Sequence, residues 1–232
     1  MTFTGALFDF SGTLFRIESV HSWLRTVLDE RGMTVEQPAF ERYVRELTSA
    51  GALPGGPLPT RVPHHLAAAW AVRDRSSDMH REAYTGLSRE VALPDPGLHD
   101  ALYTRHMSPA AWRPYPDAER VLRGLRREGT AIGVVSNIGW DLRPVFRAHG
   151  LDDLVDAYVL SFEHGIQKPD PRLFRTACTL LDREPGQVVM VGDDRRADGG
   201  AAALGCAVRF VEHLPVEDRP DGLQALGLTR TP

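Results

Sequence analysis

FDFSGTLF, residues 8–15, places an aspartate directly after a short apolar run. A glycine precedes the run and the turn-forming pair Ser11-Gly12 follows it, which is typical of a buried strand. Asp9 is therefore expected at a strand end, and Gly12 with Thr13 permits a tight turn whose backbone N–H groups can surround an anion. A carboxylate at position 11 would make an acid–base pair with Asp9, but the residue there is serine.

Apolar runs alternate with helix-like segments from about residue 130 onward. This alternation predicts βαβ units, and hence an α/β fold whose parallel sheet has helices on both faces. In such a sheet the ligand site lies at the carboxyl ends of the strands. The expected strands are 5–10, 130–137, 156–161, 187–194 and 206–211, and the expected helices are 141–150, 171–182 and 197–205.

Residues 18–107 differ from the rest, because their apolar residues recur at helical spacing and no strand is evident. Helices are expected at about 20–32, 40–47, 87–91 and 98–102, with a Gly/Pro-rich loop at 51–59 and a turn at 94–97. The chain is thus expected to leave the sheet after its first strand and return near Arg113. The predicted domains are a core of residues 1–16 and 113–232 and an all-helical insert of residues 17–112.

The composition and net charge of the chain argue against nucleic acid and membranes as binding partners. The chain has 232 residues, 42% hydrophobic and 25% charged, with a net charge of −4, as in soluble globular proteins. That charge gives no general attraction to nucleic acid or anionic membranes, and no apolar run approaches the roughly 20 residues of a membrane span. We expect a cytoplasmic monomer or homodimer whose partner is a small molecule. Cys178 and Cys206 have no metal or redox spacing, so buried free thiols are expected.

Polar residues at a predicted strand end and before a predicted helix are further candidates. Ser136 and Asn137 end VVSN (134–137), where a hydroxyl and backbone N–H groups can bind a phosphoryl oxygen. Lys168 precedes a predicted helix and is the only lysine among 27 basic residues. It is a candidate permanent cation for charge on a phosphoryl group or on Asp9.

Three carboxylates lie at or just beyond the end of the predicted strand 187–194, namely Asp193, Asp194 and Asp198. Adjacent carboxylates repel one another unless a cation or hydrogen bonds neutralise them. Helix capping explains one of the three well, but not all of them. Oxygen ligands of this kind suit Mg²⁺.

The ordered set of Asp9, Ser136, Lys168 and Asp193 resembles the four motifs of the haloacid dehalogenase-like hydrolase superfamily. FDFSGTLF is similar to the first motif, and VGDDRRADGGAAALG (191–205) is similar to the fourth. The insert resembles the helical cap that the superfamily places between motifs one and two. The resemblance covers the whole chain and implies a modified Rossmann core with Asp9 as the nucleophile of a covalent intermediate.

The resemblance also implies a ligand set for Mg²⁺. The ion would be held by the Asp9 carboxylate, the backbone carbonyl of Ser11 and Asp193, with Asp194 or Asp198 in support. Residues expected to hold the substrate and its transferring group are Thr13, Ser136, Asn137 and Lys168.

Ser11 departs from the pattern of the family's phosphatases, which usually have there a second aspartate that protonates the leaving oxygen and later activates water. A serine hydroxyl is a poor general acid or base. The superfamily's dehalogenases also lack that aspartate but need no metal, and its phosphonatases use a cap lysine, which this insert lacks. Its P-type ATPases have threonine at this position and a long-lived aspartyl-phosphate.

Three explanations of Ser11 stay open. In the first, the enzyme acts on substrates with good leaving groups or takes its acid from the cap, where Glu18 and His21 lie just beyond the motif. In the second, it forms a phospho-Asp9 that is hydrolysed slowly. In the third, it only binds a phosphorylated ligand. The histidines His64, His65 and His80 are expected on the surface.

The sequence leads to a Mg²⁺-dependent hydrolase of a small phosphorylated metabolite, acting through an aspartyl-phosphate on Asp9 with atypical acid–base catalysis. The alternatives are a hydrolase of a non-phosphate bond, of the dehalogenase type, and a catalytically weak protein that binds a phosphorylated ligand.

Overall fold

The computed structural model describes residues 3–229, which form two compact units. Unit 1 takes residues 3–16, 74–76 and 113–229, and unit 2 takes residues 17–73 and 77–112. The inclusion of Asp74–Ser76 in unit 1 has no counterpart in the sequence prediction, which assigns all of 17–112 to the insert. A hydrogen bond from Ser161 Oγ to the Asp74 carbonyl oxygen anchors this short segment.

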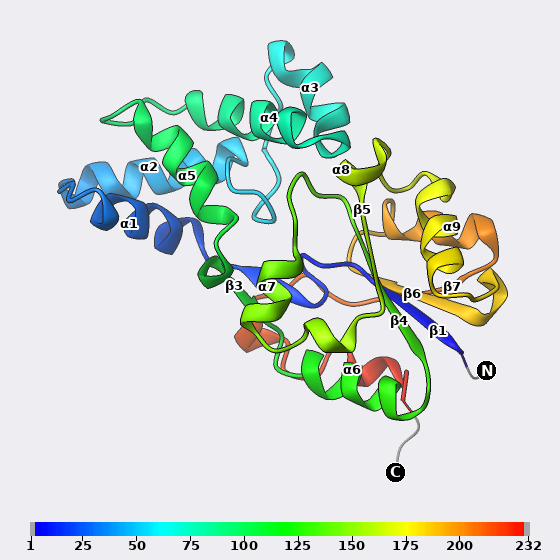
Figure 1. Cartoon of the computed structure of the whole chain (residues 1–232). Coiled ribbons are helices and arrows are strands. Elements are labelled where there is room, and N and C mark those ends of the chain that lie inside the picture. The colour runs from blue at the N-terminus through cyan, green and yellow to red at the C-terminus, as the bar shows by residue number, and fades with distance from the viewer. Residues whose placement is uncertain (1–2, 230–232) are drawn as a thin grey trace. The chain divides into compact units, whose positions relative to one another are not determined.

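Unit 1 is built on a parallel sheet with the strand order β5-β4-β1-β6-β7 (Figure 1). β1 is central: Phe8 pairs with Val134 of β4 on one side and with Val191 of β6 on the other. The predicted α/β class is confirmed, and the carboxyl ends of β1, β4 and β6 meet at one edge. The strand bounds are β1 (Gly5–Phe8), β4 (Ala131–Ser136), β5 (Ala157–Leu160), β6 (Val188–Gly192) and β7 (Ala207–Phe210).

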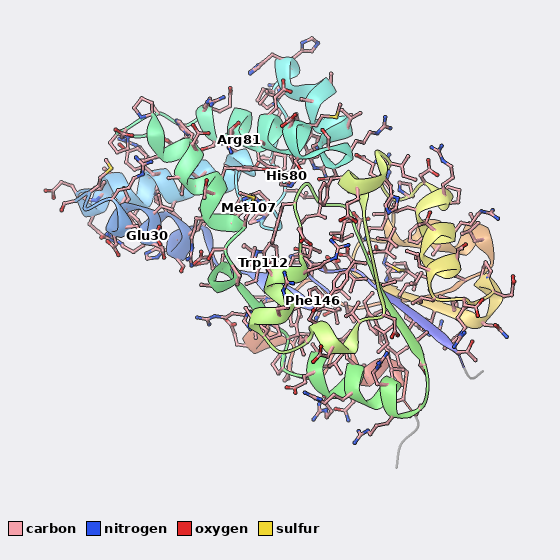
Figure 2. All side chains as sticks on the ribbon, viewed as in Figure 1. Glu30, His80, Arg81, Met107, Trp112 and Phe146 are labelled. Atoms are coloured by element: carbon pink, nitrogen blue, oxygen red, sulfur yellow. The ribbon has the colours of Figure 1, made fainter. Side chains whose placement is uncertain are left out.

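Helices cover both faces of the sheet, with α6 and α9 on opposite sides (Figure 1). The helices of unit 1 are α6 (Ala118–Arg127), α7 (Arg143–Ala148), α8 (Ser161–His164) and α9 (Pro171–Leu180). On one face Leu7 of β1 belongs to a buried cluster with Phe174 of α9. Elsewhere Phe146 of α7 (Figure 2) lies with its ring centroid 5.9 Å from Phe10 and 4.9 Å from Phe15. These aromatic contacts fix both ends of the turn that follows Asp9.

Two details of unit 1 differ from expectation. Residues 197–205 are predicted as a helix, but the chain forms a 3₁₀ helix at Asp198–Leu204. Gly199 and Gly200 are weak helix formers, and a Cβ atom at Gly200 would lie 2.4 Å from the Pro169 carbonyl oxygen, so the second glycine is needed for close approach. The helix α6 is not predicted, although its buried residues recur at helical spacing.

Unit 2 is mainly helical. Its helices are α1 (Val20–Glu30), α2 (Gln37–Ala50), α3 (Ala67–Val72), α4 (Ser77–Arg89) and α5 (Gly97–His106). Ser19 begins α1 by accepting the Ser22 N–H, and Trp23 Nε1 donates to the Leu102 carbonyl oxygen at 2.9 Å, which joins α1 to α5. α3 is not predicted, and α4 begins well before the expected helix at 87–91.

A second, two-stranded sheet is formed by β2 (Phe15–Ile17) and β3 (Trp112–Pro114), neither of which is predicted. Such short strands have too few residues for an alternating pattern to emerge. Cys178 and Cys206 are free and buried, as expected. Among the described residues, no helix combines the length and apolar character that crossing a bilayer requires.

Candidate active site

Charged side chains from three separate segments meet at the carboxyl edge of the unit 1 sheet. Asp9 follows β1, Asp198 begins the 3₁₀ helix after β6, and Lys168 lies in the loop between α8 and α9. Lys168 Nζ donates to Asp9 Oδ1 at 2.7 Å and to Asp198 Oδ1 at 2.6 Å. Lys168 is 4% exposed and Asp198 is 0% exposed, so the lysine charge is shared by two carboxylates away from water.

The backbone of Lys168 is held by the side-chain amide of Asn137. The Lys168 N–H donates to Asn137 Oδ1 at 2.6 Å, and Asn137 Nδ2 donates to the Lys168 carbonyl oxygen at 3.0 Å. The sequence suggests a substrate contact for Asn137; in the structure both ends of its side-chain amide fix the loop that carries Lys168. Ser136, next to it at the end of β4, is buried.

Asp198 is fixed by the loop that precedes it. Its Oδ2 accepts the Asp194 N–H at 3.0 Å. Gly192 makes room for this arrangement, because a Cβ atom there would lie 2.0 Å from Asp198 Oδ2. Asp194 itself is exposed, and its Oδ1 accepts the backbone N–H groups of Arg196 at 2.8 Å and Ala197 at 2.9 Å. Asp194 therefore caps the turn and stands outside the carboxylate cluster.

Asp193 is held by two side chains. Thr13 Oγ1 donates to Asp193 Oδ1 at 3.3 Å, and His213 Nδ1 donates to Asp193 Oδ2 at 2.5 Å. Arg16 contacts the same imidazole at Nε2. Thr13, expected to face substrate, is fully buried and supports the carboxylate. His213 is missed by the sequence reasoning, because it belongs to no motif and follows the last predicted strand.

Burial and the gathering of carboxylates together set the electrostatics of the cluster. Carboxylate oxygens of Asp9, Asp193 and Asp198 lie within 4.8 Å of one another, and the ammonium of Lys168 is bonded to Asp9 and Asp198. Burial, reinforced by Asp198 and Asp193, raises the pKa of Asp9 to about 8 although Lys168 opposes this. Burial disfavours the charged lysine, but the two carboxylates bonded to it raise the pKa of Lys168 above its usual range. An oxygen-only set with this charge is suited to a divalent cation.

Asp193 behaves differently from Asp9. Burial opposes its ionisation, but the hydrogen bond and charge of His213 outweigh burial and lower the pKa of Asp193. Asp193 is therefore the more readily ionised of the two carboxyl groups that follow adjacent strands. Ser11, partly buried, forms a backbone bridge with Phe15, so the turn between them is closed without a carboxylate at position 11.

Glu18 and His21, the candidate acids beyond the first motif, contact other residues of unit 2. Glu18 accepts from Arg105 Nε at 2.7 Å and from Ser22 Oγ at 2.6 Å. His21 is exposed, with its ring centroid 4.8 Å from that of Phe40.

His80 (Figure 2) is expected on the surface, but it is buried and its Nδ1 lies 2.8 Å from the Tyr103 hydroxyl oxygen. Burial lowers the pKa of His80, so its neutral form fills the space among aromatic rings of α4 and α5. His64 and His65 are exposed, as expected.

The chain is similar to several known proteins. A family model for haloacid dehalogenase-like hydrolases matches residues 3–205. The chain is 30% identical over 202 residues to (S)-2-haloacid dehalogenase 4A from Burkholderia cepacia, covering 86% of this chain and 78% of that protein. It is also 40% identical over 91 residues to phosphoserine phosphatase from Thermus thermophilus, covering 39% of this chain and 36% of the phosphatase. It spans less than half the length of several other curated relatives.

A crystal structure described as a dehalogenase superposes with a TM-score of 0.68 at 25% identity, covering 99% of this chain and 98% of that chain. The family match extends over most of the chain and includes Asp9, Lys168 and the three aspartates after β6. The chain belongs to the haloacid dehalogenase-like hydrolases.

Proposed function

We propose that the chain is a metal-dependent hydrolase of a small phosphorylated metabolite, with Asp9 as the nucleophile. The observation that carries this proposal is an excess of carboxylates: oxygens of Asp9, Asp193 and Asp198 lie within 4.8 Å of one another, and Lys168 is bonded to only two of the three. A divalent cation on Asp9 and Asp193, with the Ser11 carbonyl as a further ligand, would balance that excess. Mg²⁺ prefers such oxygen ligands, and when bound it supplies positive charge that offsets repulsion between Asp9 and an anionic phosphoryl group.

The proposed reaction has two steps. In the first, an Asp9 carboxylate oxygen forms a bond to phosphorus while the bond to the leaving oxygen breaks, and that oxygen takes a proton from water. In the second, water attacks phosphorus, inorganic phosphate leaves, and the Asp9 carboxylate is restored. Lys168 stays charged throughout and, with Ser136, offsets the charge of the transferring group. Ser11 contributes no proton, so we propose substrates whose leaving group departs without strong acid catalysis.

A second candidate is hydrolysis of a carbon–halogen bond in a small haloacid. It is supported by the 30% identity to the Burkholderia cepacia dehalogenase and by Ser11, which leaves the site without a second motif-one acid. In this reaction Asp9 displaces halide from carbon to form an ester, and water then attacks the Asp9 carbonyl carbon. The ion pair with Lys168 partly balances the charge of Asp9 without any metal.

Metal removal combined with isotope labelling separates the two reactions. The phosphatase proposal expects turnover of phosphate monoesters that is lost in EDTA and restored by Mg²⁺, with ¹⁸O from labelled water appearing in phosphate. A dehalogenase would keep its haloacid turnover in EDTA and place ¹⁸O in the Asp9 carboxylate during a single turnover. Failure to hydrolyse either substrate class would contradict both reactions and leave a ligand-binding protein.

Ser11→Asp tests whether the missing acid is the main limit on phosphatase turnover. An aspartate at this position supplies a proton donor and acceptor, which is typically worth about 10²- to 10⁴-fold in rate. We expect phosphatase turnover to rise by about 10²-fold or more, most for substrates with poor leaving groups. Ser11→Asn is the matched control, because its amide has similar size but exchanges no proton. An equal rise in both variants would show that size, not proton transfer, is responsible.

A further inference from the structure

The segment after β7 lies beyond the residues that the family model matches, yet it contacts the turn that follows Asp9. Arg219, 4% exposed, donates from Nη1 to the Gly12 carbonyl oxygen at 2.5 Å and from Nη2 to the Thr13 carbonyl oxygen at 2.5 Å. Nη1 also donates to the Glu212 carbonyl oxygen at 2.9 Å. One buried guanidinium thus binds two consecutive carbonyl groups of the turn that follows Asp9.

Contacts on both sides of Arg219 hold it in place. The ring centroid of Tyr115 lies 3.2 Å from its guanidinium carbon, and the Tyr115 hydroxyl donates to the Leu214 carbonyl oxygen at 2.6 Å. Further along the segment, Asp117 Oδ2 accepts the N–H groups of Leu223 at 2.7 Å and Gln224 at 2.9 Å. Tyr115 and Asp117, just before α6, therefore fix the segment on either side of the arginine.

The same segment packs on the turn at a second point. Gly12 has φ +80°, and a Cβ atom there would lie 2.3 Å from His213 Nδ1 and 2.4 Å from Asp193 Oδ2. Only glycine satisfies both the backbone angle and this close approach. The turn is thus enclosed by His213 on one side and by Arg219 at its carbonyl groups.

Because a peptide group is planar, a hydrogen bond that fixes its carbonyl also fixes the direction of its N–H. The carbonyl of Gly12 and the N–H of Thr13 belong to one planar trans peptide and point in opposite directions. The same holds for the Thr13 carbonyl and the N–H of Leu14, which donates to the Phe10 carbonyl oxygen at 3.0 Å. Because both carbonyl oxygens are bonded to Arg219, the Thr13 N–H is held facing away from the guanidinium.

We infer that Arg219 is a positioning residue that holds the turn after Asp9 in one conformation and so keeps the Asp9 carboxylate in place for attack. A turn whose carbonyl groups could rotate would let the residues that lead into it shift, and a small misplacement of a nucleophile lowers the rate of the chemical step. The inference rests on the proposed function to the extent that Asp9 is the nucleophile, which holds for both a phosphate ester and a haloacid. It assigns a role in the reaction to the segment beyond residue 205.

Two arginine substitutions test the inference with a matched control. Arg219→Gln removes the charge and the paired donors, and Arg219→Lys keeps the charge but has no planar fork for two carbonyls. Arg183→Gln is the control, because Arg183 Nε donates to the Thr4 carbonyl oxygen at 3.1 Å, near the other end of β1. The amides of Gly12, Leu14 and Phe15 donate to backbone carbonyl oxygens within the turn, Gly12 to Phe15 and the other two to Phe10. Their hydrogen exchange is measured first, because it needs no turnover.

We expect exchange at these amides to become about 10-fold faster or more in both Arg219 variants and to stay unchanged in Arg183→Gln. We also expect kcat to fall by about 10-fold or more with KM changed less, and added guanidinium to restore part of kcat in Arg219→Gln. Measuring far below the unfolding temperature of each variant separates this pattern from a general loss of fold.

Three results would overturn the inference: unchanged exchange at the turn in Arg219→Gln, the same acceleration in Arg183→Gln, or accelerated exchange with kcat at the wild-type value. A wild-type protein that hydrolyses neither substrate class would contradict the proposed function separately. The exchange comparison alone would then decide whether Arg219 holds the turn.

Discussion

Asp9→Asn is expected to lower turnover by about 10⁴-fold or more, because an amide oxygen cannot replace a carboxylate as nucleophile. The folded protein is expected to be at least as stable as the wild type. Burial and the neighbouring Asp198 and Asp193 disfavour the charged form of Asp9 and raise its pKa to about 8. A neutral side chain of the same shape relieves that repulsion, and its Oδ1 can still accept from Lys168.

Turnover and thermal unfolding, measured on the same samples in EDTA and in Mg²⁺, check this expectation. Asp153→Asn is the matched control, because Asp153 is exposed in a 3₁₀ helix of unit 1, remote in sequence from every motif residue. It is expected to retain full turnover. Substantial activity in Asp9→Asn would remove Asp9 from the nucleophile role, whichever substrate the enzyme uses.

Lys168→Met is expected to have the largest effect on stability and to abolish turnover as well. It leaves the carboxyl groups of Asp9 and Asp198 buried without their shared cation, and loss of one partner from a buried ion pair typically costs about 3–5 kcal/mol. It also removes the positive charge next to the nucleophile Asp9. Loss of this one charge therefore lowers both the turnover and the stability of the protein.

The stability loss in Lys168→Met is expected to depend on pH. Lys168 lowers the pKa of both carboxyl groups, so its removal raises their pKa in the folded protein further above the unfolded value. A group with a raised folded pKa binds more protons when folded, and stability then falls as pH rises from about 4 upward. The deficit relative to the wild type should therefore be smaller near pH 5 than near pH 8.

Denaturant unfolding in EDTA at the two pH values measures this difference. Arg172→Met is the matched control, because Arg172 pairs with Asp170 at the protein surface and such pairs contribute little. Its stability should stay close to that of the wild type at both pH values. A pH-independent deficit in Lys168→Met would show that lost packing, not uncompensated charge, accounts for the change.

The charged centre of the site is predictable from sequence because a parallel sheet brings its strand ends to one edge. Asp9 and Asp193 follow adjacent strands, and their proximity follows once the βαβ order is recognised. Lys168 stands out as the only lysine of the chain. Its two partners, Asp9 and Asp198, could be proposed from charge, since a buried ammonium needs carboxylates nearby.

The supporting residues are less accessible to sequence reasoning, because their roles depend on contacts between distant segments. Thr13 and Asn137 are polar residues beside strand ends, and nothing in the sequence shows that their side chains bind Asp193 and the Lys168 backbone. His213 and Arg219 lie in a segment without regular spacing, so they have no pattern to reveal them. Gly12 offers an indirect signal, since a turn glycine often marks close approach of another segment.

The most direct test of the central claim is a search for a covalent bond between substrate and Asp9. Enzyme quenched with acid during steady turnover is digested, and the peptide that contains residues 8–15 is examined by mass spectrometry. We expect a substrate-derived group on Asp9 in the wild type and none in Asp9→Asn, with the phosphoryl form if the phosphatase proposal holds. Rapid turnover with this peptide unmodified at every quench time would contradict the account.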